Sequence, residues 1–82
     1  MNEEKLTFWF IPSLVSVLLR HEQDAGRPLT EAEVLRIRDG AQAVMAPIDL
    51  IPRLEQERGY RDIDPENCWH EWQVARKDFS QT

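Results

Sequence analysis

The amino-acid sequence predicts a small all-α domain, a bundle of about four short helices preceded by an extended or irregular N-terminal arm. Three observations predict this fold class. The chain has 82 residues, which is enough for one domain over residues 1–82. With 41% hydrophobic and 30% charged residues, its composition is that of a globular protein rather than of a disordered one. Proline, glycine and capping residues also divide the chain into segments whose apolar residues recur at helical spacing.

The first helix is expected from about Pro12 to Ala25. Proline suits the first turn of a helix, where its missing N–H is not needed. Leu14 and Leu18 follow each other at helical spacing along one side. Gly26 then fits the left-handed position just past the last turn, so the helix should end there.

The second helix has the clearest start in the chain. Thr30 and Glu33 stand at the spacing of a reciprocal capping box, in the sequence Thr-Glu-Ala-Glu. From Val34 onward apolar residues recur at helical spacing as far as Met45. Pro47 cannot continue a helix without a break, so this helix is expected to end near Met45.

Two shorter helices should complete the bundle. Asp49 could cap the third helix, and Gly59 should close it. The fourth helix is expected to open at Asp64 and Pro65, because aspartate caps well and proline favours the first helical position. The last residues, 80–82, are expected to fray.

Residues 1–11 do not fit a regular pattern. Phe8, Trp9 and Phe10 are consecutive aromatic residues, which suits neither a clean amphipathic helix nor a clean strand. Two outcomes stay open for this segment. It could be an extended arm that lies across the domain or across a neighbouring chain, or residues 5–11 could contribute a strand.

The most apolar stretch of the chain covers residues 6–19. It is shorter than the roughly 20 residues that a membrane helix needs, and Pro12 and Ser13 interrupt it. Acidic residues precede it, where a signal peptide would carry positive charge. We therefore expect a core or interface segment, and no association with a membrane.

The charge balance limits the partners. Ten Lys and Arg residues face fifteen Asp and Glu residues, which gives a net charge of -5. Nucleic-acid binding depends on neutralising phosphates, so a negative chain is not expected to bind nucleic acid. An acidic surface would instead attract a basic protein. Cys68 is the only cysteine, so the chain has no intrachain disulfide and a cytoplasmic location is expected.

No motif predicts catalysis, a cofactor or a metal. Residues 62–67 alternate carboxylates as a calcium loop does at its start. The sixth and twelfth positions of that loop would be Asn67 and Gln73, where glycine and glutamate are needed. Cys68 could act as a nucleophile only if the fold brought a histidine such as His21 beside it. We therefore expect no enzyme and read Cys68 as a core residue.

The leading hypothesis is a non-catalytic protein-interaction domain that associates with itself, most simply as a homodimer. A regulatory or toxin-neutralising subunit would have such a sequence. Aromatic residues anchor protein interfaces, and a chain of this length leaves apolar surface uncovered when it folds. The expected contact residues are Phe8, Trp9, Phe10, Leu14 and Trp72.

The alternative hypothesis is a small-ligand or sensor domain with an aromatic pocket. Three tryptophans in a chain of this length are many, and tryptophan and tyrosine rings commonly line ligand pockets. Arginines beside the pocket could hold an anionic group. The residues expected to line it are Arg58, Tyr60, Arg61, Trp69 and Trp72.

Overall fold

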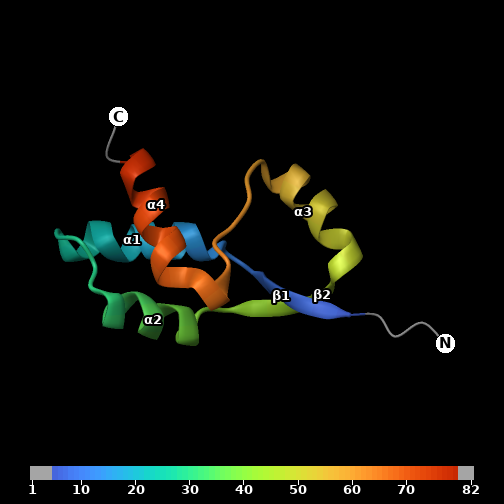
Figure 1. Cartoon of the computed structure of the whole chain (residues 1–82), viewed down its shortest axis with the longest axis horizontal. Coiled ribbons are helices and arrows are strands. Elements are labelled where there is room, and N and C mark those ends of the chain that lie inside the picture. The colour runs from blue at the N-terminus through green and yellow to red at the C-terminus, as the bar shows by residue number, and fades with distance from the viewer. Residues whose placement is uncertain (1–4, 80–82) are drawn as a thin grey trace.

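A computed structural model describes residues 5–79, so residues 1–4 of the expected arm and the expected frayed tail, 80–82, lie outside the described part. The protein is mostly helical, but it also contains a two-stranded antiparallel sheet, so the all-α prediction is wrong (Figure 1). The elements in order are β1 (Leu6–Phe10), α1 (Leu14–Ala25), α2 (Glu31–Gly40), β2 (Ala43–Pro47), a 3-10 turn (Ile48–Leu50), α3 (Ile51–Arg58), a second 3-10 turn (Pro65–Asn67) and α4 (Cys68–Phe79).

The largest correction concerns the expected second helix, which ends at Gly40 instead of near Met45. Ala41 is extended, with φ -72° and ψ 144°, and the following residues form β2. β2 pairs with β1 in antiparallel register, with Trp9 opposite Val44. The apolar residues that suggested helical spacing fit a strand equally well, and glycine weakens a helix by about 1 kcal/mol relative to alanine. Pairing with the aromatic β1 therefore favours a strand over a helix for β2. The same pairing makes Leu6–Phe10, within the expected N-terminal arm, a strand.

The helix boundaries mostly follow the local capping residues. Gly26 and Gly59 adopt left-handed conformations, with φ 68° and 94°, and end α1 and α3 as predicted. Thr30 and Glu33 form the predicted reciprocal capping box. Asp64 accepts a hydrogen bond from the Glu66 amide and starts the 3-10 turn that leads into α4.

Two helices begin slightly later than predicted. α1 begins at Leu14, because the hydroxyl of Ser13 accepts the Ser16 amide and so caps the helix two residues after the expected start. α3 begins at Ile51, because a 3-10 turn takes up the residues around the expected cap, Asp49.

The core lies among α1, α2 and α4. Leu14 and Leu18 from α1 and Val34 from α2 are fully buried there, together with Trp72 from α4. Phe10 joins them from the end of β1. The strands project from this helical body as a two-stranded ribbon with α3 beside it, which gives the molecule an elongated shape of 50 × 25 × 18 Å (Figure 1).

The start of α2 gives a testable electrostatic prediction. Arg27 donates two hydrogen bonds to the Glu33 carboxylate, at 2.8 and 2.7 Å. These bonds and the Thr30 amide lower the pKa of Glu33 from 4.5 to about 2. A lowered pKa in the folded state means that ionised Glu33 stabilises the fold above pH 4.5, and that this stabilisation is lost as the pH falls through about 2.

Arg27→Gln should therefore raise the pKa of Glu33 toward its ordinary value and reduce the loss of stability over that pH range. An NMR titration of the Glu33 side-chain carboxyl carbon measures the pKa directly. Arg20→Gln is the matched control, because Arg20 pairs with Asp24 on another helix. An unchanged Glu33 titration in Arg27→Gln would contradict the assigned cause.

Candidate functional site

The ribbon presents one face that is apolar and open. Paired residues of antiparallel strands point to the same side of a sheet, so Leu6, Phe8 and Met45 share one face. We call this the outer face and define it by these three residues. Their exposed fractions are 49%, 59% and 52%, which is high for large apolar side chains. The outer face is thus an uncovered apolar surface.

The opposite face of the ribbon is partly covered. Ala46 is buried there and Trp9 is half-buried, whereas Val44 is exposed. The guanidinium carbon of Arg58, at the end of α3, lies 3.9 Å from the centre of the Trp9 ring. A cation stacked on an aromatic ring at this distance attracts it electrostatically. This contact joins α3 to the Trp9 side of the ribbon, so the outer face is the more open of the two.

The two edges of the ribbon differ. The Ile11 amide donates to the Gln42 carbonyl, and the Ile48 amide donates to the Lys5 carbonyl, at the two ends of the paired region. Hydrogen-bonded pairs alternate along an antiparallel ladder, so the backbone groups of Leu6 and Phe8 point away from β2. On the other edge, Pro47 of β2 has no N–H to offer. The edge of β1 is therefore the one able to pair with another strand.

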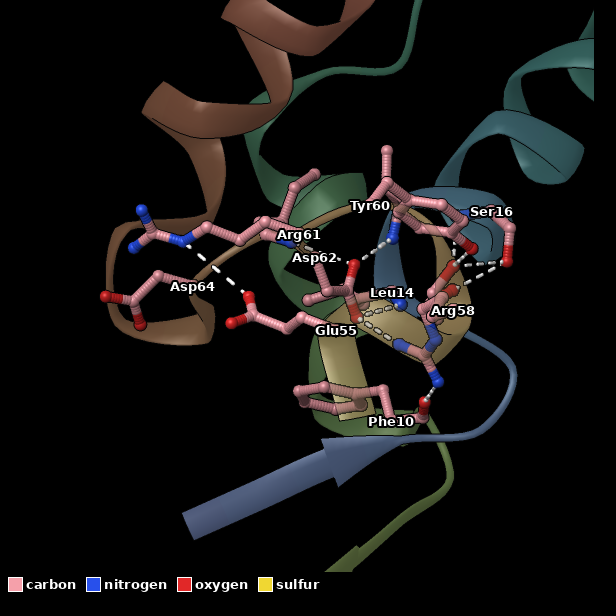
Figure 2. Close-up of polar contacts among 12 residues, drawn as sticks. Phe10, Leu14, Ser16, Glu55, Arg58, Tyr60, Arg61, Asp62 and Asp64 are labelled. Carbon is pink, nitrogen blue, oxygen red and sulfur yellow. Dashed lines mark hydrogen bonds and ion pairs between the residues drawn. The ribbon is translucent and has the colours of Figure 1, made fainter. Parts of the chain in front are cut away.

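A buried carboxylate connects the ribbon to the helical body. Asp62 lies in the connector between α3 and α4, and its two oxygens accept the amides of Leu14 and Val15 at 2.7 and 2.9 Å (Figure 2). It also accepts the Ile63 amide at 2.8 Å. Asp62 therefore satisfies the first amides of α1, which no intrahelical carbonyl can reach, and its negative charge suits the positive end of the helix dipole.

Arg58 completes this connection. One of its nitrogens, Nη1, lies 3.6 Å from the Asp62 carboxylate, and the other, Nη2, donates to the Phe10 carbonyl at 2.7 Å (Figure 2). The Arg58 and Asp62 side chains are only 14% and 12% exposed. Each buried charge is compensated by the other and by backbone groups, which is the condition for burying an ion pair without a large penalty.

Tyr60 adds a contact from the connector to the start of α1. Its hydroxyl lies 2.6 Å from the hydroxyl of Ser13, the buried N-cap residue of that helix. We call Ser13, Arg58, Tyr60 and Asp62 the anchor cluster. It ties β1, the start of α1, the end of α3 and the connector to one another, and it sets the direction in which the ribbon leaves the body.

The expected interface residues divide between surface and core. Phe8 is exposed on the ribbon and Trp9 is half-buried beneath Arg58. Phe10, Leu14 and Trp72 are buried in the core of this single chain. Of the five expected contact residues, only Phe8 and part of Trp9 are available to a partner in this conformation.

The expected pocket residues are also separated by the fold. Trp72 is fully buried and Trp69 packs against the core, with Arg76 near both rings. Tyr60 and Arg61 line a groove of about 510 Å³ whose other walls belong to α1 and α4: Val15, Ser16, Leu19, Ala75 and Asp78. Arg58 turns instead to Trp9 and Asp62.

Two members of the site are not evident from local sequence patterns. The helical spacing predicts Met45 at the end of a helix, whereas its alternation with Ala43 also fits a strand face. Asp62 is close enough to Arg58 in the sequence to suggest that it neutralises this arginine, and the two side chains do form an ion pair. Its separation of 48 residues from Leu14, however, leaves no local sign that it caps α1. The run of aromatic residues at 8–10 marks this segment as irregular and leaves a strand over residues 5–11 open.

The described residues do not show an activated nucleophile. Burial raises the pKa of the Cys68 thiol to about 11, so the thiol is protonated at neutral pH. His21 and His70 are both exposed, whereas Cys68 is buried. Within residues 5–79, no three His, Cys, Asp or Glu side chains are grouped to hold a metal ion.

Comparison of the chain with protein-family models, curated proteins and solved structures gives no match. No helix in the described part of the chain has the length and apolar character needed to cross a membrane.

The anchor cluster can be tested by Asp62→Asn. This change removes the charge that compensates Arg58 and replaces one acceptor oxygen by an amide that cannot accept the Leu14 or Val15 amide. Breaking one side of a buried ion pair should lower the free energy of unfolding by about 3 kcal/mol. Urea denaturation measures the change.

The matched control is Glu57→Gln, which breaks an ion pair with Arg53 that is exposed on α3. Such a surface pair contributes only about 0.5 kcal/mol or less. Similar effects of Asp62→Asn and Glu57→Gln on stability would show that the anchor cluster does not hold the fold.

Proposed function

We propose that this chain is a non-catalytic protein-interaction domain that associates with a second copy of itself through the outer face. The distribution of exposed apolar side chains carries this proposal. Nine large hydrophobic residues are exposed in the described chain, and seven of them fall within 6–11 and 44–50: Leu6, Phe8, Ile11, Val44, Met45, Ile48 and Leu50. The ribbon and the turn after it therefore hold most of the uncovered apolar surface.

The chemistry of the outer face suits the centre of an interface. Every residue on that side of the two strands is apolar: Leu6, Phe8, Phe10, Ala43, Met45 and Pro47. The centres of protein interfaces are depleted of charged residues and enriched in phenylalanine and methionine. Removing a face of this kind from water is favourable by about 25 cal/mol per Å² of apolar area.

A second copy is the partner that the ribbon itself favours. An isolated two-stranded sheet is only marginally stable in water, and α3 covers one face alone. A two-fold axis would place the outer face of one ribbon on that of the other, so that each copy covers the same apolar patch. Two packed sheets lie about 10 Å apart, a distance that phenylalanine and methionine side chains fill.

The wider setting is part of the same proposal. The net charge of -5 supports a basic protein as a further partner and gives no support to nucleic acid or an anionic membrane. A single cysteine supports a cytoplasmic location. A small self-associating domain of this kind could serve as a regulatory or toxin-neutralising subunit.

Met45→Glu tests self-association. Met45 is 52% exposed in the single chain, so the change should alter the stability of the monomer by no more than about 0.5 kcal/mol. In a dimer it would bury an unpaired charge, which should raise the dissociation constant by roughly tenfold or more. Light scattering over a concentration series measures the molecular mass.

Val74→Glu is the control, because it places the same charge on an equally exposed apolar position of α4. The wild type and Val74→Glu should form dimers over the same range of concentration, while Met45→Glu stays monomeric. A wild type that remains monomeric at all concentrations would refute the proposal. Equal dimerisation of Met45→Glu would exclude the outer face as the contact.

A further inference from the structure

We infer that the free edge of β1 accepts an extended, basic segment of a partner protein as a third strand. This inference rests on the proposed function, because it presupposes a protein-interaction domain. It concerns the edge of the ribbon and the two grooves beside it, which adjoin the outer face at Phe8.

The backbone of β1 supplies the first requirement. The N–H and C=O groups of Leu6 and Phe8 point away from β2, and no described residue forms a hydrogen bond with them. The next outward carbonyl, that of Phe10, already accepts the Arg58 guanidinium. The open part of the edge thus runs from Leu6 to Phe8, and an added strand would satisfy these four backbone groups.

The opposite edge of the ribbon does not compete. The outward-facing residues of β2 are Ala43, Met45 and Pro47, which follows from the same alternation. Pro47 has no N–H, and proline on an edge strand blocks the addition of another strand. An incoming segment would therefore pair with β1.

The surface beside β1 has room for a chain. One groove of about 620 Å³ and another of about 250 Å³ flank the strand, and both are lined by Thr7, Phe8, Phe10, Asp64 and Pro65. The first extends toward the end of α2, and the second extends toward α3. Because successive side chains of a strand point to opposite sides, an added strand could place its alternate side chains in the two grooves.

The charges that line these grooves indicate a basic segment. Asp39, Glu55 and Asp62 each have an arginine partner, which is Arg38, Arg61 and Arg58 respectively. Asp64 and Glu66 make no ion pair with a described residue, and both are exposed. Asp64 lines both grooves and Glu66 lines the larger one, and lysine or arginine in the incoming segment would neutralise them.

The test uses an eight-residue peptide in which lysine alternates with valine. The peptide is titrated into ¹⁵N-labelled Met45→Glu protein, in which Met45 lines neither groove and self-association is removed. We expect saturable shifts of the Leu6 and Phe8 amide signals and slower hydrogen exchange at both. The same peptide N-methylated at every amide, and a peptide that alternates glutamate with valine, should not bind.

Glu66→Gln, made in the Met45→Glu background, should weaken binding of the lysine–valine peptide by roughly two- to fivefold. Glu31→Gln in the same background is the matched control, because Glu31 is equally exposed at the start of α2 and lines neither groove. Absence of any Leu6 or Phe8 shift with the lysine–valine peptide would overturn the inference. Equal binding of the N-methylated peptide would also overturn it, since strand pairing requires amide donors.

One further outcome separates this inference from the proposed function. If the Leu6 and Phe8 amides of the wild type become protected as protein concentration rises, and the peptide has no effect, a second copy occupies the edge. That result would overturn the inference that a basic segment pairs with β1, while supporting self-association. Conversely, peptide binding to a wild type that never dimerises would support the third strand and refute self-association through the outer face.

Discussion

The carboxylate of Asp62 is the group on which the arrangement of body and ribbon depends. A helix leaves its first amides without intrahelical partners, and in α1 two of these amides donate to Asp62 instead. The same carboxylate faces Arg58, which reaches both the Phe10 carbonyl and the Trp9 ring. One connector residue thereby compensates a helix end and a buried arginine, and it joins elements that are distant along the chain.

This connection explains why apolar surface accumulates on the ribbon. The core among α1, α2 and α4 takes in only the Phe10 end of β1, and Arg58 holds α3 against the Trp9 side. The side with Phe8 and Met45 has no covering element in the described chain. Self-association through the outer face and strand addition at the β1 edge are two ways in which other chains would supply what is missing.

Local signals allowed part of the fold to be predicted, and distant contacts explain the rest. The capping box at Thr30 and the left-handed Gly26 act within a few residues, so both were predicted correctly. β2 depends on pairing with β1, and its alternation resembled helical spacing, so an all-α bundle was expected wrongly. Among the site residues, Phe8 could be recognised from its aromatic neighbours. The contact of Asp62 with α1 could not, because the two amides that it accepts lie 47 and 48 residues earlier in the chain.

Hydrogen exchange at the first turn of α1 tests the role of Asp62 most directly. First-turn amides usually exchange quickly because they lack a partner. The amides of Leu14 and Val15 should instead be as well protected as the core, while those of Glu31 and Ala32, in the exposed first turn of α2, should exchange quickly. Fast exchange at Leu14 and Val15, at the rate of Glu31 and Ala32, would contradict the central place given to the Asp62 carboxylate.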